Sequence, residues 1–340
     1  MRKFTFLILL GVVVALAGAA TAVGIRGASG TLFVTERQLG SVTAFDAATG
    51  NVLWTSPTGP NPTGVTRPHG TGRVYTSDEN ANQMSVFDER TGAFLHVISM
   101  GSRPHHLMAS PDGDFIYVGE FGQNTIGVVD TSTDSEVAHY ATSANSDART
   151  HGVWISNDGE NLYATNTVVP TISKLDATTG TLIWEFGIGS NPSEILVTQD
   201  DKLAYVSVRN EDTIKVVDVS GEAPVVIGQA EAKSQPDTLS LTNDGKTLVV
   251  GLRASPSGRA RAGLIDTATL TTRYVEMLGH TTTGHQWLSA NGKFTFMAVE
   301  SPGAVAVIDN GSGALVDEYP YPGGGLRPHG VFYEPRRLRR

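Results

Sequence analysis

The sequence predicts an all-β fold built from one repeated four-stranded unit. The clearest copy runs from Arg103 to Asp130, where apolar stretches alternate with turn sequences such as Ser110-Pro111-Asp112-Gly113. An aspartate that closes the third strand of the unit recurs every 42 to 48 residues. The aspartates are Asp46, Asp88, Asp130, Asp176, Asp218, Asp266 and Asp309. Self-similarity at this period is typical of solenoids and propellers.

The residues around each aspartate decide between these two architectures. A turn such as Ala48-Thr49-Gly50 follows the aspartate, and a fourth strand such as Leu182 to Phe186 follows the turn. Frequent Gly and Pro turns exclude a helical repeat, and four short strands in about 42 residues make a propeller blade. Seven aspartates therefore predict a seven-bladed β-propeller.

The two ends of the repeat predict how the ring closes. The chain enters the first blade with a strand of the second type, Thr31 to Thr35, and ends with a strand of the first type, Arg327 to Tyr333. We expect the C-terminal strand to pair into the first blade, because that pairing removes two open sheet edges.

Four short motifs carry a family resemblance. Pro-His-Gly, Ser-Pro-Asp-Gly, Tyr117-Val118-Gly119-Glu120 and Tyr163-Ala164-Thr165-Asn166 resemble the YVTN-type (YncE-like) β-propeller repeat over about residues 31 to 335. The resemblance implies the architecture, whereas propellers host many unrelated functions.

Composition limits the partners. The chain has 340 residues, a net charge of −9 and no cysteine. The negative charge argues against nucleic acid, because phosphate binding needs a basic face. The lack of cysteine excludes disulfides, thiolate metal ligands and covalent haem attachment.

The N-terminus predicts export. An apolar stretch followed by Ala20-Thr21-Ala22 is typical of a cleaved secretory signal, and the alternative is an uncleaved membrane anchor. The expected segments are a signal at 1–22, a linker at 23–30, the propeller at 31–335 and a basic tail at 336–340. We expect a periplasmic or secreted monomer with no transmembrane span after cleavage.

One mouth of the channel is predicted to gather polar side chains, because inner strands begin there and second strands end there. The inner strands start near His105, His151, His285 and His329, and residues placed opposite them are Glu120, Asn166, Glu300 and Glu36. Arginines lie two residues before three of these histidines, at Arg103, Arg149 and Arg327.

This set predicts two kinds of site. Imidazoles and carboxylates suit a divalent metal, with His105, Glu120, His151, His329 and Glu36 as ligands. Arg103, Arg149, Arg327 and Asn166 would hold an anionic ligand. The alternative is that the histidines only cap the inner strands as ordinary members of the repeat.

The His-to-Glu spacing also resembles the divalent-metal site of streptogramin B lyase, a seven-bladed propeller. That resemblance implies catalysis by His105, Glu120, His285 and Glu300. The turn after His285 comes one residue early, so either His285 or Glu300 is out of register with the other pair.

We therefore expect a binding scaffold rather than an enzyme, with a small ligand, a metal or a partner protein at one mouth of the channel. The alternatives are a metal-dependent lyase or lactonase, and an accessory protein in periplasmic redox or cofactor maturation. A divalent metal is the one cofactor that these residues predict.

Overall fold

The computed structural model describes residue 25 and residues 28–253 and 258–335 of the 340-residue chain. The predicted signal at 1–22 and the basic tail at 336–340 lie outside the described residues. Among the described residues, no helix is long and apolar enough to cross a membrane.

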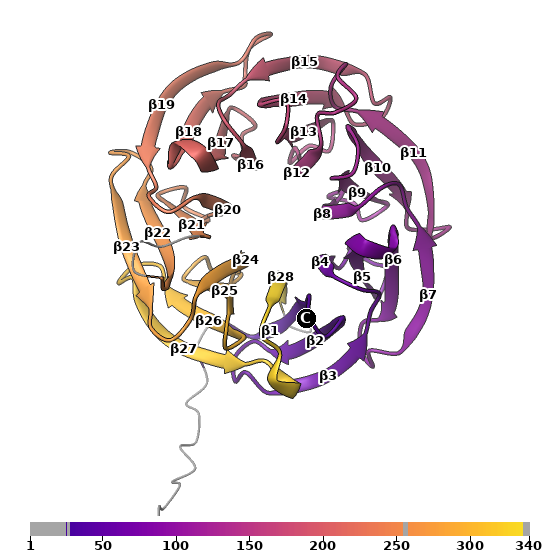
Figure 1. Cartoon of the computed structure of the whole chain (residues 1–340), viewed down its shortest axis with the longest axis vertical. Helices are drawn as coiled ribbons and strands as arrows, with labels where there is room; N and C mark the ends of the chain where they lie inside the picture. The colour runs from indigo at the N-terminus through magenta and orange to yellow at the C-terminus, as the bar shows by residue number, and fades with distance from the viewer. Residues whose placement is uncertain (1–24, 26–27, 254–257, 336–340) are drawn as a thin grey trace, which may run out of the picture.

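Seven four-stranded antiparallel sheets form a ring around a central channel (Figure 1). Blade 1 contains β1 (Gly30–Glu36), β2 (Ser41–Asp46), β3 (Val52–Pro57) and β28 (Pro328–Pro335). Blade 2 contains β4 (Pro62–Thr66), β5 (Arg73–Asp78), β6 (Gln83–Asp88) and β7 (Phe94–Ser99). Blade 3 contains β8 (Pro104–Ala109), β9 (Phe115–Glu120), β10 (Thr125–Asp130) and β11 (Ser135–Ala141). Blade 4 contains β12 (Thr150–Ile155), β13 (Asn161–Asn166), β14 (Thr171–Asp176) and β15 (Leu182–Gly187).

The other three blades follow the same order. Blade 5 contains β16 (Pro192–Val197), β17 (Leu203–Val208), β18 (Thr213–Asp218) and β19 (Val225–Glu231). Blade 6 contains β20 (Pro236–Leu241), β21 (Thr247–Leu252), β22 (Ala260–Asp266) and β23 (Thr272–Met277). Blade 7 contains β24 (Thr282–Leu288), β25 (Phe294–Glu300), β26 (Ala304–Asp309) and β27 (Ala314–Pro320). Single 3-10 turns occur at Glu79–Ala81, Arg209–Glu211 and Pro322–Gly324.

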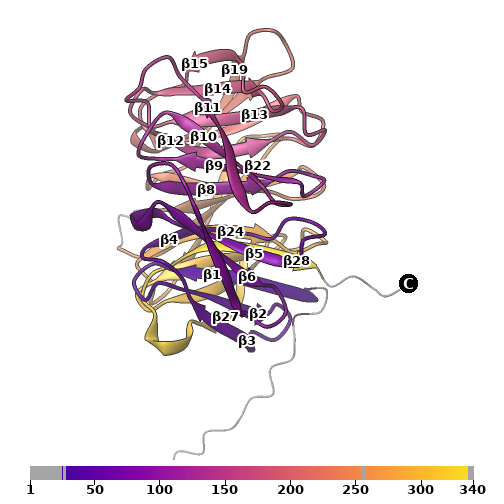
Figure 2. The same ribbon diagram turned by 90° about the vertical axis from the view of Figure 1, so that its right-hand side faces the viewer.

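The predicted ring closure is confirmed. β28 pairs antiparallel with β1, so that Leu32 lies opposite Tyr333, and the sheet order of blade 1 is β28-β1-β2-β3. β28 is the inner strand of this blade and faces the channel, as β4, β8, β12, β16, β20 and β24 do in theirs (Figure 1). In side view the blades enclose a short, thick ring (Figure 2).

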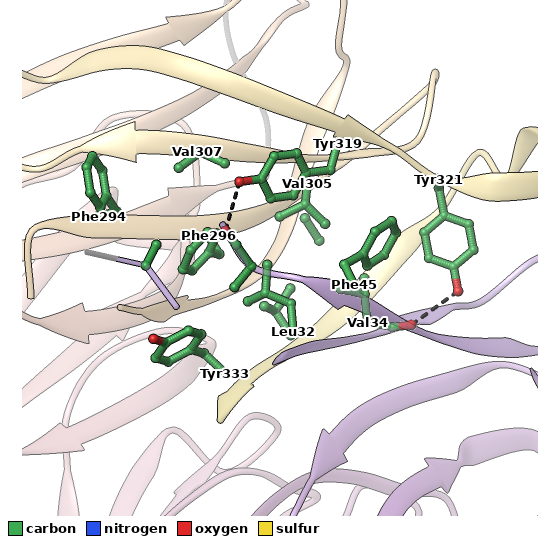
Figure 3. Packing of buried hydrophobic residues seen from close by; sticks show 14 residues of the cluster. Leu32, Val34, Phe45, Phe294, Phe296, Val305, Val307, Tyr319, Tyr321 and Tyr333 are labelled. Carbon is green, nitrogen blue, oxygen red and sulfur yellow. Dashed lines mark hydrogen bonds between the residues drawn. The ribbon is translucent and has the colours of Figure 1, made fainter. Parts of the chain in front are cut away.

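Blades 7 and 1 are held together by an apolar cluster that includes strand β28. Phe296 of β25 stacks on Tyr333 of β28, with ring centroids 5.6 Å apart (Figure 3). The tyrosine hydroxyls of this cluster still find acceptors: Tyr319 donates to the carbonyl of Ala47 at 2.9 Å, and Tyr321 to that of Val34 at 3.1 Å. Burial of several aromatic rings with satisfied hydroxyls makes the closure a well-packed interface.

The repeated aspartate closes a turn in each blade. Oδ1 of Asp176 accepts from the backbone N–H of Thr178 at 3.0 Å and of Thr179 at 2.7 Å, and from the Thr179 hydroxyl at 2.9 Å. This pattern is an Asx turn, which leaves the following glycine, Gly180, in the left-handed region at φ 70°. The local chemistry of Asp-x-Thr-Gly therefore explains the strongest signal in the sequence.

Candidate functional site

Each inner strand has a β-bulge near its start, and in blade 3 the bulge brings two consecutive side chains together. In blade 3, Pro104 pairs with Glu120 and Leu107 with Val118, so three residues on β8 span two residues on β9. The extra residue places His105 and His106 side by side, with ring centroids 4.6 Å apart. Bulges re-aim side chains in this way next to functional sites.

Five histidines from four blades meet in the channel. The rings of His106 and His285 have centroids 4.1 Å apart, and those of His106 and His151 are 4.4 Å apart. His105 lies 4.5 Å from His151, and His329 lies 4.9 Å from His285. Burial lowers the pKa of each ring, to about 3 for His106 and His285, so the cluster is neutral near pH 7.

His151 is held in one tautomer by its neighbours. Its Nδ1 lies 2.8 Å from the carbonyl oxygen of Ser193 and therefore carries the proton, which it donates. Its Nε2 then accepts from Nη2 of Arg209 at 3.2 Å. Both nitrogens of His151 are satisfied, so this residue has a structural role in orienting Arg209.

Arg209 and Asp237 form a buried ion pair beside the histidines. Nε of Arg209 lies 3.1 Å from Oδ1 of Asp237, and Arg253 approaches the other carboxylate oxygen at 3.6 Å. Burial alone raises the pKa of Asp237, but the guanidinium groups of Arg209 and Arg253 outweigh it and lower that pKa.

Glu194 is a buried carboxyl that lines the cavity and has no guanidinium partner in hydrogen-bond contact. Its Oε2 lies 2.7 Å from Nδ1 of His106. Burial raises the pKa of Glu194 to about 8. Glycine at position 152 gives this carboxyl room, because a Cβ there would lie 2.8 Å from Oε1.

A cavity of about 870 Å³ extends from these residues through the channel. His106, Glu194 and His285 line its inner end. More of the wall is apolar than polar, with Met108, Trp154, Leu196, Leu241, Trp287 and Tyr333 among its apolar residues, and polar turn residues such as Asp200 and Asp244 line the far end. The cavity reaches turns such as Thr198–Asp200, where the inner strands end. We call the channel end where the inner strands begin the first mouth, and the opposite end, which the cavity reaches, the second mouth.

The predicted metal ligands are brought together only in part. His105, His151 and His329 lie in the histidine cluster. Glu120 instead contacts its own blade, with Oε2 accepting from Gln123 at 2.7 Å and lying 3.0 Å from Nδ1 of His139. Glu36 accepts from the backbone N–H of Arg327 at 2.6 Å and so fixes a loop.

The predicted anion-binding residues are also scattered. Asn166 is fully buried, and its amide donates to Thr171 and Ser173 at 3.0 Å. Arg103 contacts Glu79 and lies 4.8 Å from the ring centre of Phe121. Arg149 is exposed, and Arg327 lies 3.5 Å from Glu300.

The structure shows which of His285 and Glu300 is out of register in blade 7. Glu300 lies opposite Thr282, as Glu120 lies opposite Pro104. The bulge of β24 falls between Thr283 and Gln286, one residue later than in β8, so it is His285 that is shifted along its strand. The shift places His285 deeper in the channel, beside His106.

Two kinds of residue that face the channel were not predicted from the sequence. In blades 2, 3 and 5 the residue after the end of the second strand faces the first mouth: these residues are Glu79, Phe121 and Arg209. The other kind occupies the glycine position of Pro-His-Gly. Four blades have Gly64, Gly152, Gly284 and Gly330 there, whereas His106, Glu194 and Thr238 occupy it in the other three. Departures from glycine were the signal in the sequence for this site.

Three groups of side chains among the described residues bring ligand atoms within 4.8 Å of one another. They are His105 with His106 and His151, His106 with Glu194 and His285, and Glu120 with Glu136 and His139. The first two lie in the channel and share His106. Three buried ring nitrogens of the cluster lack a hydrogen-bond partner: Nδ1 of His105, Nε2 of His285 and Nδ1 of His329.

Fold and channel together define a seven-bladed β-propeller with a closed ring. Two family models match parts of this chain: "Lactonase, 7-bladed beta-propeller" over residues 157–260 and "Outer membrane protein assembly factor BamB" over residues 17–146. A comparison with curated protein sequences finds no match.

Solved structures resemble the chain over nearly its whole length. A chain of hydrazine synthase from Kuenenia stuttgartiensis is 20% identical with a TM-score of 0.71, over 88% of this chain and 99% of that one. A protein of unknown function from Desulfotomaculum acetoxidans is 15% identical with a TM-score of 0.75, over 91% and 100%. The periplasmic gluconolactonase of Pseudomonas aeruginosa is 19% identical with a TM-score of 0.68, over 89% and 98%. Likeness at these identities establishes the fold alone.

Proposed function

We propose that this propeller binds a small organic molecule in the channel cavity, with an apolar body against the wall and a polar group against His106 and Glu194. The observation that carries the proposal is a cavity of about 870 Å³ with a mainly apolar wall and a polar inner end. Sites for small molecules have this volume and this distribution of polar groups.

The wall chemistry supports a flat or flexible apolar body. Trp154 and Trp287 offer aromatic faces, while Met108 offers a side chain that adapts to different shapes. Gln286 also lines the cavity, but its amide is engaged with Thr238 and with the carbonyl of Val249 and is not free to bind. A ligand would therefore place a single polar group against His106 and Glu194.

The test uses γ-decalactone, which has an apolar tail and one polar ring, as the probe. Binding should change the tryptophan emission, because Trp154 and Trp287 line the cavity. Filling the wall with Met108→Phe and Leu241→Phe together should abolish the change, whereas Ile183→Phe on the exposed outer strand β15 should not. Emission that responds equally in all three proteins would contradict the proposal.

The second candidate is hydrolysis of a lactone in the same cavity. It is favoured by the lactonase family model, whose matched residues 157–260 include Glu194 and the cavity-lining stretch Thr238–Gly245. Chromatography of γ-decalactone after incubation distinguishes the two. Ring opening that disappears in Glu194→Gln supports the enzyme, and binding without ring opening supports the scaffold.

A further inference from the structure

The inner end of the cavity holds a carboxyl and two imidazoles that converge from three blades. His106 is on β8, Glu194 on β16 and His285 on β24, and each offers a ligand atom within 4.8 Å of the other two. Two histidines and one carboxylate form a common ligand set for divalent transition metals.

The partners of these side chains leave the set available. Nε2 of His285 is buried without a hydrogen-bond partner. Besides a backbone hydrogen bond with Ile195, Glu194 contacts the imidazole of His106 at 2.7 Å, while the nearby guanidinium of Arg209 is engaged by Asp237. Burial makes ionisation of Glu194 unfavourable without a cation, and a buried imidazole nitrogen without a partner has a cost of its own. A bound cation would satisfy both groups at once.

The neighbouring triad of His105, His106 and His151 fits a metal less well. His151 already uses both ring nitrogens, toward Ser193 and Arg209. A cation there would displace Arg209 from His151 and would lie beside its positive charge. In the set containing Glu194, a cation would displace no hydrogen bond of Arg209, and ionised Glu194 would supply a negative charge.

We propose that His106, Glu194 and His285 form a three-ligand site for a divalent transition metal ion of the Zn²⁺ type. All three line the cavity, so coordination positions of the ion would remain open on the cavity side. Three protein ligands with an open position are typical of zinc ions that polarise a bound water or carbonyl oxygen. This set shares no residue with the metal ligands predicted from the repeat, which are His105, Glu120, His151, His329 and Glu36.

The inference rests on the proposed function only in leaving coordination positions of the ion open to a ligand in the cavity. Metal binding itself is measured without any organic molecule. Chelator-treated full-length protein is titrated with Zn²⁺ by calorimetry, and with Co²⁺ by visible absorption. We expect one ion per chain, Co²⁺ absorption in the range of nitrogen and oxygen coordination, and a rise in melting temperature with Zn²⁺.

Substitutions assign the ligands. Glu194→Gln keeps the size of the side chain and should abolish stoichiometric binding, as should His285→Asn. His151→Asn and His139→Asn are the matched controls, because they belong to the other two candidate groups, and both should bind Zn²⁺ as the wild type does. Melting curves without metal verify that each variant is folded.

Three results would overturn the inference. They are no binding of Zn²⁺ or Co²⁺ by folded wild-type protein, binding that Glu194→Gln retains, and binding that His151→Asn or His139→Asn abolishes. A protein that binds Zn²⁺ but not γ-decalactone would contradict the proposed function and leave the metal site standing. The reverse result would contradict the metal site alone.

Discussion

Asp237 and Glu194 are buried carboxyls on the inner strands of adjacent blades, yet their surroundings differ. Asp237 faces Arg209 and Arg253 at the first mouth, and these guanidinium groups lower its pKa. Glu194 lies beside His106 at the inner end of the cavity with no guanidinium group in hydrogen-bond contact, and burial raises its pKa to about 8. The repeat supplies equivalent strands, while the neighbouring side chain decides whether a buried acid is neutralised by a cation.

The same contrast holds for the two ends of the channel. The first mouth is lined with charged pairs such as Arg37–Glu79 at 3.4 Å and Arg327–Glu300 at 3.5 Å. The cavity toward the second mouth has a mainly apolar wall and an acid–imidazole contact at its inner end. Fixed charge pairs hold a structure in place, whereas unsatisfied polar groups beside an apolar cavity are available to a ligand.

The largest effect is expected from removing β28, which contributes to both ends of the channel. A chain that stops at Gly325 loses His329 from the histidine cluster, Tyr333 from the cavity wall and the strand that closes blade 1. We expect no cooperative unfolding transition by calorimetry, because the ring is left with an open edge. A chain that stops at Pro335 is the control, and a sharp transition in both would contradict the closure.

The next largest effect is expected at Asp237. Asp237→Asn leaves the buried guanidinium of Arg209 without its counter-charge and should lower the free energy of unfolding by about 3 kcal/mol. Glu194→Gln removes no ion pair and should change it by less than about 1 kcal/mol in metal-free protein. Urea unfolding measures the free energy of unfolding of both variants. Equal losses would contradict the view that Asp237 is in a buried ion pair and Glu194 is not.

A smaller effect is expected from Phe121, which covers the histidine cluster at the first mouth. Its ring centroid lies 5.6 Å from that of His105 and 5.4 Å from that of His151. Phe121→Ala should lower the free energy of unfolding by about 2 kcal/mol, which is less than for a fully buried phenylalanine, because Phe121 is only partly buried. It should also speed the reaction of His105 and His151 with diethyl pyrocarbonate, followed by mass spectrometry. An unchanged rate of reaction would show that other residues shield His105 and His151 at the first mouth.

The smallest effect is expected at the turn aspartates, far from the channel. Hydrogen bonds from the backbone and hydroxyl of Thr179 lower the pKa of Asp176, so its folded-state pKa lies below its unfolded value. The stabilisation is complete above an ordinary pKa of about 4 and is lost as pH falls through the folded-state value. Asp176→Asn should therefore lower the melting temperature at pH 7 and leave it nearly unchanged at the lowest pH. Equal shifts at both pH values would exclude a charge effect.

Channel residues were predictable only where side chains alternate regularly between the two faces of a strand. This alternation correctly predicted that His105, His151 and His329 face the channel, because they lie near the starts of their strands. It misplaced Glu120, whose side chain turns into blade 3, and it left out His106, which reaches the channel through a bulge. A bulge adds one residue and reverses the alternation beyond it, and no local sequence rule fixes its position.

The sequence by itself determined the seven blades, their four strands and the closing partner of β1. These features follow from local chemistry that repeats: Asp-x-Thr-Gly turns, Ser-Pro-Asp-Gly turns and apolar alternation act within one blade. Tertiary structure alone decided that Glu194 meets His106 and His285, since these residues lie on three different blades. Contacts across the channel depend on bulge position and on the closeness of neighbouring backbones, and both are set by packing of the whole ring.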